Sequence, residues 1–155
     1  MMSRLIGTGA VALGLLALAA APAPADAASK GPPACAKIYF RPLPAGQNDG
    51  EQEAGLYTSR FSHVELKAQV KGGEAQNYYL TAHNQKLSPV AGALPAAAVN
   101  CAKAKKLPAP GKAATSCTGQ RFAAVIAHAG KEKAALLYAL HDRTWQYCSA
   151  GTLGS

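Results

Sequence analysis

Residues 63–71 carry the clearest pattern in the sequence, a strict alternation of polar and apolar side chains. The polar positions are His63, Glu65, Lys67, Gln69 and Lys71, and the apolar positions are Val64, Leu66, Ala68 and Val70. Because alternate side chains of a strand point to opposite faces, this segment is predicted to be a half-buried β-strand. Residues 72–74 (GGE) then predict a turn, and residues 75–83 (AQNYYLTAH) predict a second strand.

The register of this hairpin can be predicted from burial. A two-residue turn at Gly72-Gly73 would place Leu66 opposite Tyr79, whereas a three-residue turn would place Leu66 opposite Leu80. Only the second pairing gathers the apolar side chains of both strands on one face. We therefore predict the register of the three-residue turn, since a slip by one residue would mix the two faces.

Weaker patterns predict the remaining elements. Pro95 suits the first turn of a short helix over residues 94–105. Residues 134–141 (AALLYALH) are compatible with a helix or a strand, and the strand is favoured because a strand and a turn precede them. Further strands are predicted at residues 36–41, 121–128 and 144–148, and polar or Pro/Gly loops at residues 45–54 and 106–116. The predicted fold class is α+β, with a small antiparallel β-sheet of hairpins, one short helix and two disulfides.

The first residues have the features of a secretory leader. A basic start, Met1–Arg4, precedes an apolar run over Leu5–Ala20, and Ala25-Asp26-Ala27 is a small-residue cleavage site. The run is shorter than the ~20 apolar residues that a membrane-spanning helix needs. We therefore predict a signal peptide over residues 1–27 and a single exported domain over residues 28–155, soluble and either periplasmic or secreted. The Ala-rich leader is typical of bacteria.

The four cysteines, Cys35, Cys101, Cys117 and Cys148, predict two disulfides, because an even number of cysteines in an oxidising compartment is usually paired. No C-x-x-C spacing is present, which argues against a zinc ribbon or a thioredoxin-like redox pair. The favoured pairing is Cys101–Cys117 with Cys35–Cys148. The pairing of Cys35 with Cys101 and of Cys117 with Cys148 remains open.

Charge is the main indication of function. Of 155 residues, 16 are Lys or Arg and 8 are Asp or Glu, for a formal charge of +8. No acidic residue occurs between Ala75 and Lys131. The candidate basic surface in this stretch consists of Lys86, Lys103, Lys105, Lys106, Lys112 and Arg121. Such a surface attracts anionic partners. Because the protein is predicted to be exported, an anionic envelope component or an acidic protein is favoured over nucleic acid.

A metal site is the first alternative. In the predicted register His63 lies opposite His83, and Glu65 is diagonal to His83, so two imidazoles and one carboxylate would face the same side of the hairpin. Such ligands suit Zn²⁺ or Cu²⁺. The three residues lack a characteristic metal-binding spacing, and the main hypothesis includes no cofactor.

A small envelope hydrolase is the second alternative. Its only candidate acid–base pair is His141 with Asp142, and adjacent strand residues point to opposite faces. No serine lies in a G-x-S-x-G motif. The acids Asp49, Glu51 and Glu53 fall on the predicted 45–54 loop, which is a poor platform for fixed catalytic geometry. The sequence therefore favours a binding or accessory module without catalysis, and leaves its oligomeric state open.

Overall fold

Strands dominate the computed structural model, which describes residues 35–59, 62–82, 85–89, 94–129 and 132–153. All of these residues belong to the unit formed by Pro33–Ser155. The predicted signal peptide lies outside the described residues. In chain order the elements are β1 (Cys35–Phe40), β2 (Gly50–Thr58), β3 (His63–Lys71), β4 (Glu74–Ala82), β5 (Gln85–Lys86), β6 (Ser88–Pro89), α2 (Ala96–Ala104), β7 (Arg121–Ala129), β8 (Glu132–His141) and β9 (Thr144–Thr152).

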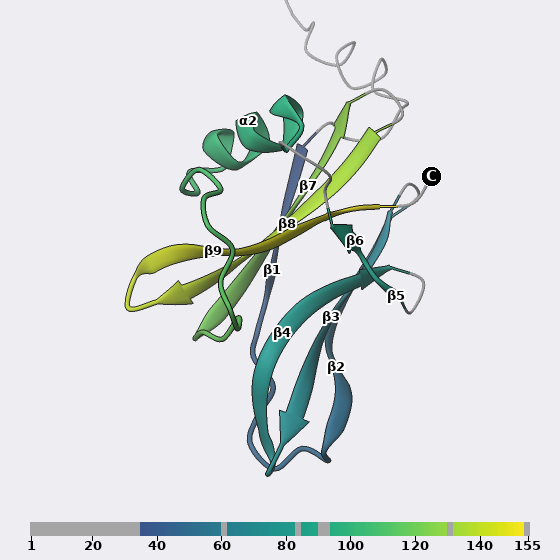
Figure 1. Ribbon diagram of the computed structural model, residues 1–155, viewed down its shortest axis with the longest axis vertical. Helices are drawn as coiled ribbons and strands as arrows, with labels where there is room; N and C mark the ends of the chain where they lie inside the picture. The colour runs from purple at the N-terminus through teal and green to yellow at the C-terminus, as the bar shows by residue number, and fades with distance from the viewer. Residues whose placement is uncertain (1–34, 60–61, 83–84, 90–93, 130–131, 154–155) are drawn as a thin grey trace, which may run out of the picture. The chain divides into compact units, whose positions relative to one another are not determined.

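The strands form two antiparallel sheets (Figure 1). One has five strands in the order β1-β7-β8-β9-β6, and the other has four in the order β2-β3-β4-β5. The predicted antiparallel hairpins, single short helix and two disulfides are therefore present in the described chain. Residues 134–141 lie in a strand, as favoured. The protein is mostly β rather than a balanced α+β fold, because a further strand includes residues 50–54, which the sequence predicts as loop.

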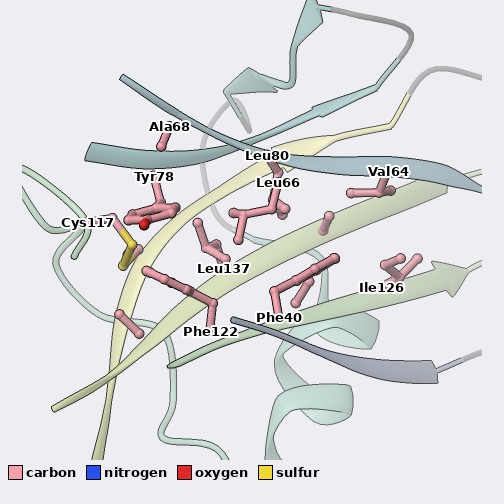
Figure 2. Packing of buried hydrophobic residues seen from close by; sticks show 14 residues of the cluster. Phe40, Val64, Leu66, Ala68, Tyr78, Leu80, Cys117, Phe122, Ile126 and Leu137 are labelled. Atoms are coloured by element: carbon pink, nitrogen blue, oxygen red, sulfur yellow. A yellow bond between two sulfur atoms is a disulfide. The ribbon is translucent and has the colours of Figure 1, made fainter. Parts of the chain in front are cut away.

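The main core lies between the inner faces of the two sheets (Figure 2). From the four-stranded sheet Val64, Leu66 and Leu80 point inward, and from the five-stranded sheet Phe122 and Leu137 do so. The rings of Tyr78 and Phe122 meet across the core with centroids 4.2 Å apart. The alternation seen in residues 63–71 therefore marks a strand with one buried apolar face.

The β3–β4 hairpin has the predicted register, with Leu66 opposite Leu80, but reaches it by a different route. The turn has two residues, since Lys71 pairs with Glu74. Between Gln69 and Val70 the pairing shifts by one residue, so that a β-bulge on β4 restores the register that buries the apolar side chains. Gly72 and Gly73 have φ angles of 65° and 82°, which suit a two-residue turn with both central residues in the left-handed region.

The loop predicted over residues 45–54 is wrong in its second half. Residues 50–54 belong to β2, an edge strand that pairs only with β3 among the described strands. Its apolar–polar alternation is interrupted by a bulge between Glu53 and Gly55 and by two glycines, Gly50 and Gly55. Because an edge strand over a polar face buries little apolar surface, the hydrophobic pattern is weak there.

Helix α2 covers part of the outer face of the five-stranded sheet (Figure 1). Small buried residues of the helix, Ala98 and Ala102, pack against a second cluster that includes Val125, Leu136 and Tyr138. The helix begins after Pro95, as the sequence predicted, because proline fits a helix start where no backbone N–H partner is needed.

The favoured disulfide pairing is wrong, and the alternative left open is the one observed. Cys35 is bonded to Cys101 and Cys117 to Cys148, each with Cα atoms 5.5 Å apart. Cys101 lies on α2 over the outer face of the sheet, whereas Cys117 and Cys148 belong to the core between the sheets. Cys101 and Cys117 are therefore on opposite sides of one sheet and cannot pair.

The segment between α2 and β7 passes around strand β9 from one face of the five-stranded sheet to the other. On the outer face, the Tyr138 hydroxyl donates to the Pro108 carbonyl at 2.8 Å. Further along, the Ala114 N–H donates to the carbonyl of Cys148 at 3.1 Å. At its inner end the Cys117 N–H donates to Asn77 Oδ1 at 2.7 Å. These contacts hold a Pro/Gly-rich segment in place without regular secondary structure.

Candidate anion-binding surface

Most of the predicted cations lie on helix α2 or in the segment that follows it. Lys103 is in the last turn of α2, Lys105 caps its C-terminus, and Lys106 and Lys112 are exposed in the segment that follows. Arg121 is the exposed first residue of β7. Because Cys101 is bonded to Cys35, this segment is not closed into a loop by the favoured Cys101–Cys117 bond.

Lys86 is the remaining cation of the predicted basic surface. It lies in β5, where its backbone pairs with Thr81 of the four-stranded sheet. The position of its side chain lies outside the described part of the structure. The membership of Lys86 in the basic surface therefore stays a prediction.

A cation that the charge analysis missed, Lys37, connects β1 to this group. Its ammonium group lies 3.4 Å from the carbonyl oxygen of Lys105, to which it donates a hydrogen bond. It also lies 4.7 Å from the centre of the Tyr39 ring, and the Arg121 guanidinium carbon lies 4.3 Å from the same ring centre. Both are within the range of a cation–π interaction. Tyr39 thus holds two cations in fixed positions.

Trp145 completes this cluster from β9. Its ring stacks with that of Tyr39, with centroids 6.0 Å apart and an interplanar angle of 26°. Tyr39 pairs with Ala123 on β7, so a small side chain lies beside it and leaves room for the two large rings to approach each other across the sheet. We call Lys37, Tyr39, Arg121 and Trp145 the aromatic–cationic cluster.

No carboxylate of the described residues is within ion-pair distance of Lys37 or Arg121. Apart from Glu132 and Asp142, the acids of the described chain lie in β2, β3 and β4 or in the loop before β2. Most of the described acids therefore lie on or beside the four-stranded sheet, whereas Glu132 and Asp142 belong to the sheet that carries the cluster. The cluster is left with a positive potential that an external anion can neutralise.

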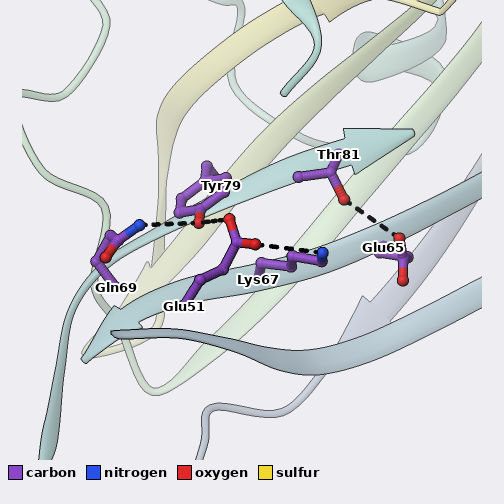
Figure 3. A network of polar contacts seen from close by, with 6 residues as sticks. All are labelled: Glu51, Glu65, Lys67, Gln69, Tyr79 and Thr81. Carbon is purple, nitrogen blue, oxygen red and sulfur yellow. Dashed lines mark hydrogen bonds and ion pairs between the residues drawn. The ribbon is translucent and has the colours of Figure 1, made fainter. Parts of the chain in front are cut away.

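The outer face of the four-stranded sheet carries a hydrogen-bonded polar network instead (Figure 3). The carboxylate of Glu51 accepts a hydrogen bond from the Tyr79 hydroxyl and forms an ion pair with Lys67 at 3.4 Å. Gln69 donates to the Tyr79 hydroxyl at 3.2 Å. The only cation of this network is thus already paired with an acid, and these residues stabilise the sheet rather than offer a free charge.

Two groups on the outer face of this sheet, Glu53 and Tyr79, have shifted pKa values. The pKa of Glu53 is raised, first because its carboxyl group hydrogen-bonds with that of Glu65, and then by burial and by the repulsion between the two groups. Glu65 is 8% exposed and accepts a hydrogen bond from the Thr81 hydroxyl at 3.5 Å. The pKa of Tyr79 is raised to about 12, mainly by burial and then by its bond to Glu51.

The predicted metal ligands are described only in part. His63 and Glu65 lie on the outer face of β3, and Thr58 Oγ1 is 3.3 Å from the Nδ1 atom of His63. His83 lies outside the described residues. Within the described ranges, no group of three His, Cys, Asp or Glu side chains is placed to hold a metal ion.

The candidate hydrolase pair occupies a turn. His141 ends β8, and Asp142 begins the β8–β9 turn with a φ of 46°, where its N–H donates to Gln120 Oε1 at 2.9 Å. In a different histidine, His128, the Nε2 atom lies 3.5 Å from Ser62 Oγ. Its buried Nδ1 has no hydrogen-bond partner in the described structure, so the third group that would orient a catalytic histidine is not observed there.

Comparison with known proteins gives no relative, since no protein-family model, curated protein or solved structure matches this chain. In the part of the chain that the structure describes, no helix is both long enough and apolar enough to cross a membrane. The function must therefore be argued from the residues themselves.

The sequence held a signal for the missed cluster residues. In AKIYFR, residues 36–41, Lys37, Tyr39 and Arg41 alternate with apolar side chains. The period of two that identified β3 therefore also places a tyrosine between two cations on one face of the strand predicted over residues 36–41. The approach of Trp145 to Tyr39 could not be predicted in the same way, because it depends on the order of strands in the sheet.

Proposed function

We propose that this chain is a small exported binding or accessory protein that meets an anionic partner through a basic surface and performs no catalysis. The basic surface is defined as Lys37, Lys103, Lys105, Lys106, Lys112 and Arg121. Its proposed partner is an anionic component of the cell envelope or an acidic protein, encountered in the periplasm or the medium.

One observation carries this proposal. Lys37 and Arg121 are held over the ring of Tyr39, and no carboxylate of the described chain pairs with either of them. A cation kept in place by an aromatic ring has already lost part of its side-chain freedom, so that less entropy is lost when an anion binds. Unpaired cations with fixed positions suit recognition better than freely moving surface lysines do.

Two features support export. The leader at residues 1–27 has the basic, apolar and small-residue regions of a signal peptide. In addition, all four cysteines are paired, and disulfides persist mainly in oxidising compartments such as the periplasm or the medium.

The proposal is tested by retention of the exported protein on a sulfated polysaccharide matrix across a salt series. Replacing Lys103, Lys105, Lys106 and Lys112 with Gln should lower the salt concentration at which the protein elutes, because such contacts are screened over ~8 Å at physiological salt. The variant should remain as stable as the wild type, since exposed lysines contribute little to folding. Lys71→Gln, which removes an exposed cation from the four-stranded sheet, is the control.

The outcome discriminates between two roles of the charge. Earlier elution of the four-lysine variant, with the Lys71 control close to the wild type, supports the basic surface as the binding surface. Elution of wild type and four-lysine variant at the same salt concentration would contradict it, and would mean that these lysines serve only solubility.

A further inference from the structure

The aromatic–cationic cluster has a property that the rest of the basic surface lacks, namely an exposed aromatic ring at its centre. Tyr39 is 44% exposed and is one of two large hydrophobic side chains that are exposed in the described chain. Trp145, stacked on it, is half-buried. Aromatic side chains combined with arginine are characteristic of the residues that contribute most to binding.

The two cations are close enough to bind one anionic group together. Because both lie within 5 Å of the same ring centre, at 4.3 and 4.7 Å, their charges are at most about 9 Å apart. Like charges at this separation repel each other, and a carboxylate between them removes the repulsion. Arginine also offers a planar pair of N–H donors that matches a carboxylate.

Two further cationic residues, Arg41 and Lys105, lie next to the cluster. Arg41 is exposed and lies two residues beyond Tyr39, while Lys105 accepts the hydrogen bond of Lys37 at the end of α2. Lys37 and Arg41 are four residues apart, roughly 13 Å along an extended chain, so they would meet charges that recur along an extended ligand. A polymer with a charge on each unit matches this row better than a single small anion does.

We infer that the aromatic–cationic cluster is a binding subsite for an acidic polysaccharide. This inference rests on the proposed function and names its ligand class. One sugar packs its apolar face against the exposed parts of Tyr39 and Trp145, and its carboxylate lies between Lys37 and Arg121. The neighbouring sugars extend toward Arg41 and Lys105.

A membrane surface fits the cluster less well. Tryptophan and tyrosine anchor proteins at a membrane by placing their rings among the lipid headgroups. Here Trp145 is half-buried and stacked on Tyr39 across the sheet, so its ring does not project from the surface as such an anchor does.

The experiment uses the full chain, expressed with its leader and purified after export, and measures binding to polygalacturonate by titration calorimetry at physiological salt. Arg121→Gln should weaken binding about tenfold because it removes a charge-assisted hydrogen bond. Tyr39→Leu should weaken it about fivefold or more with no change in net charge, whereas Tyr39→Phe, which keeps the ring, should bind as the wild type does. Lys71→Gln, which removes an exposed cation of the four-stranded sheet outside the basic surface, is the matched charge control and should stay within about twofold.

Three results would overturn the inference while leaving the proposed function intact. The first is unchanged binding by Tyr39→Leu. The second is the same weakening by Arg121→Gln and Lys71→Gln. The third is tighter binding to phosphatidylglycerol vesicles or to a single-stranded oligonucleotide than to polygalacturonate. Failure to bind polygalacturonate, the vesicles or the sulfated matrix would instead overturn the proposed function. Unfolding curves of every variant establish that a loss of binding is not a loss of folding.

Discussion

No β-carbon fits between Gly55 and the ring of Phe40. A β-carbon placed on Gly55 would lie 2.9 Å from Cε1 of Phe40 and closer still to Cδ1. Phe40 is buried in the core between the sheets, and Gly55 follows the bulge that bends β2. The contact joins the edge strand of one sheet to the first strand of the other. Position 55 requires glycine because a β-carbon there would overlap the Phe40 ring.

Gly55→Ala should therefore destabilise the protein. The added methyl group must displace the Phe40 ring from a packed core, and overpacking of this kind costs about 1–3 kcal/mol. Gly111→Ala is the matched control, because no atom lies within 4 Å of its β-carbon position. Urea unfolding of both variants measures the difference. Equal stability of the two variants would contradict the contact.

The disulfide pairing gives a second prediction. Proteolysis of the unreduced protein should yield one linked peptide pair containing Cys35 and Cys101 and another containing Cys117 and Cys148. Replacing both Cys35 and Cys101 with Ser should lower the free energy of unfolding by about 2–4 kcal/mol, since the bond restricts the unfolded chain. A linked pair containing Cys101 and Cys117 would show that the observed pairing is wrong.

The raised pKa of Glu53 predicts a pH-dependent stability. A carboxyl group with a raised pKa in the folded state favours folding below its unfolded pKa of 4.5, and this contribution is lost as the pH rises through the folded pKa. Glu53→Gln should therefore stabilise the protein at pH 7 more than at pH 4, because the amide donates to Glu65 without needing a proton. Urea midpoints at both pH values measure this.

Glu74→Gln is the control for this measurement, since it removes an exposed acid from the same sheet. The gain of the Glu53 variant at pH 7 should exceed that of the Glu74 variant. The same gain in both variants would mean that general charge, rather than the Glu53–Glu65 hydrogen bond, sets the pH dependence.

His128 should titrate below its usual pKa of 6.5, first because it is partly buried and second because of the charge of Lys133. A lowered histidine pKa stabilises the fold above the unfolded pKa, and this contribution is lost as the pH falls through the folded pKa. Following the ring protons by NMR should show His128 titrating below the normal value, and Lys133→Gln should raise it. A midpoint at or above 6.5 in the wild type would contradict this placement.

Strands with one strongly buried face could be predicted from the sequence, and strand β2 could not. The alternation over residues 63–71 identified β3 and its register with β4, because Leu66 and Leu80 must both face the core. The segment that forms β2 lies at a sheet edge and carries Glu51 and Glu53 toward a polar network, so its pattern resembled a solvated loop. A strand that buries few apolar side chains shows only a weak alternation of polar and apolar residues in its sequence.

Part of the candidate site was predictable for the same reason. Arg121 and the lysines near α2 were found from charge alone, and the alternation in β1 would have placed Lys37 and Tyr39 on one face. The contact of Tyr39 with Trp145 depends on the order β1-β7-β8-β9 and on the small Ala123 beside Tyr39. No local pattern contains either fact.

The sequence by itself determined the antiparallel hairpins, the short helix after Pro95 and the even number of cysteines, because each depends on neighbouring residues or on composition. The tertiary structure alone decided which cysteines pair, since Cys101 and Cys117 are separated by a sheet whose two faces the chain reaches by passing around β9. It also decided that two cations share the ring of Tyr39. Both outcomes depend on the stacking of elements that are distant in the chain, and local periodicity carries no information about that stacking.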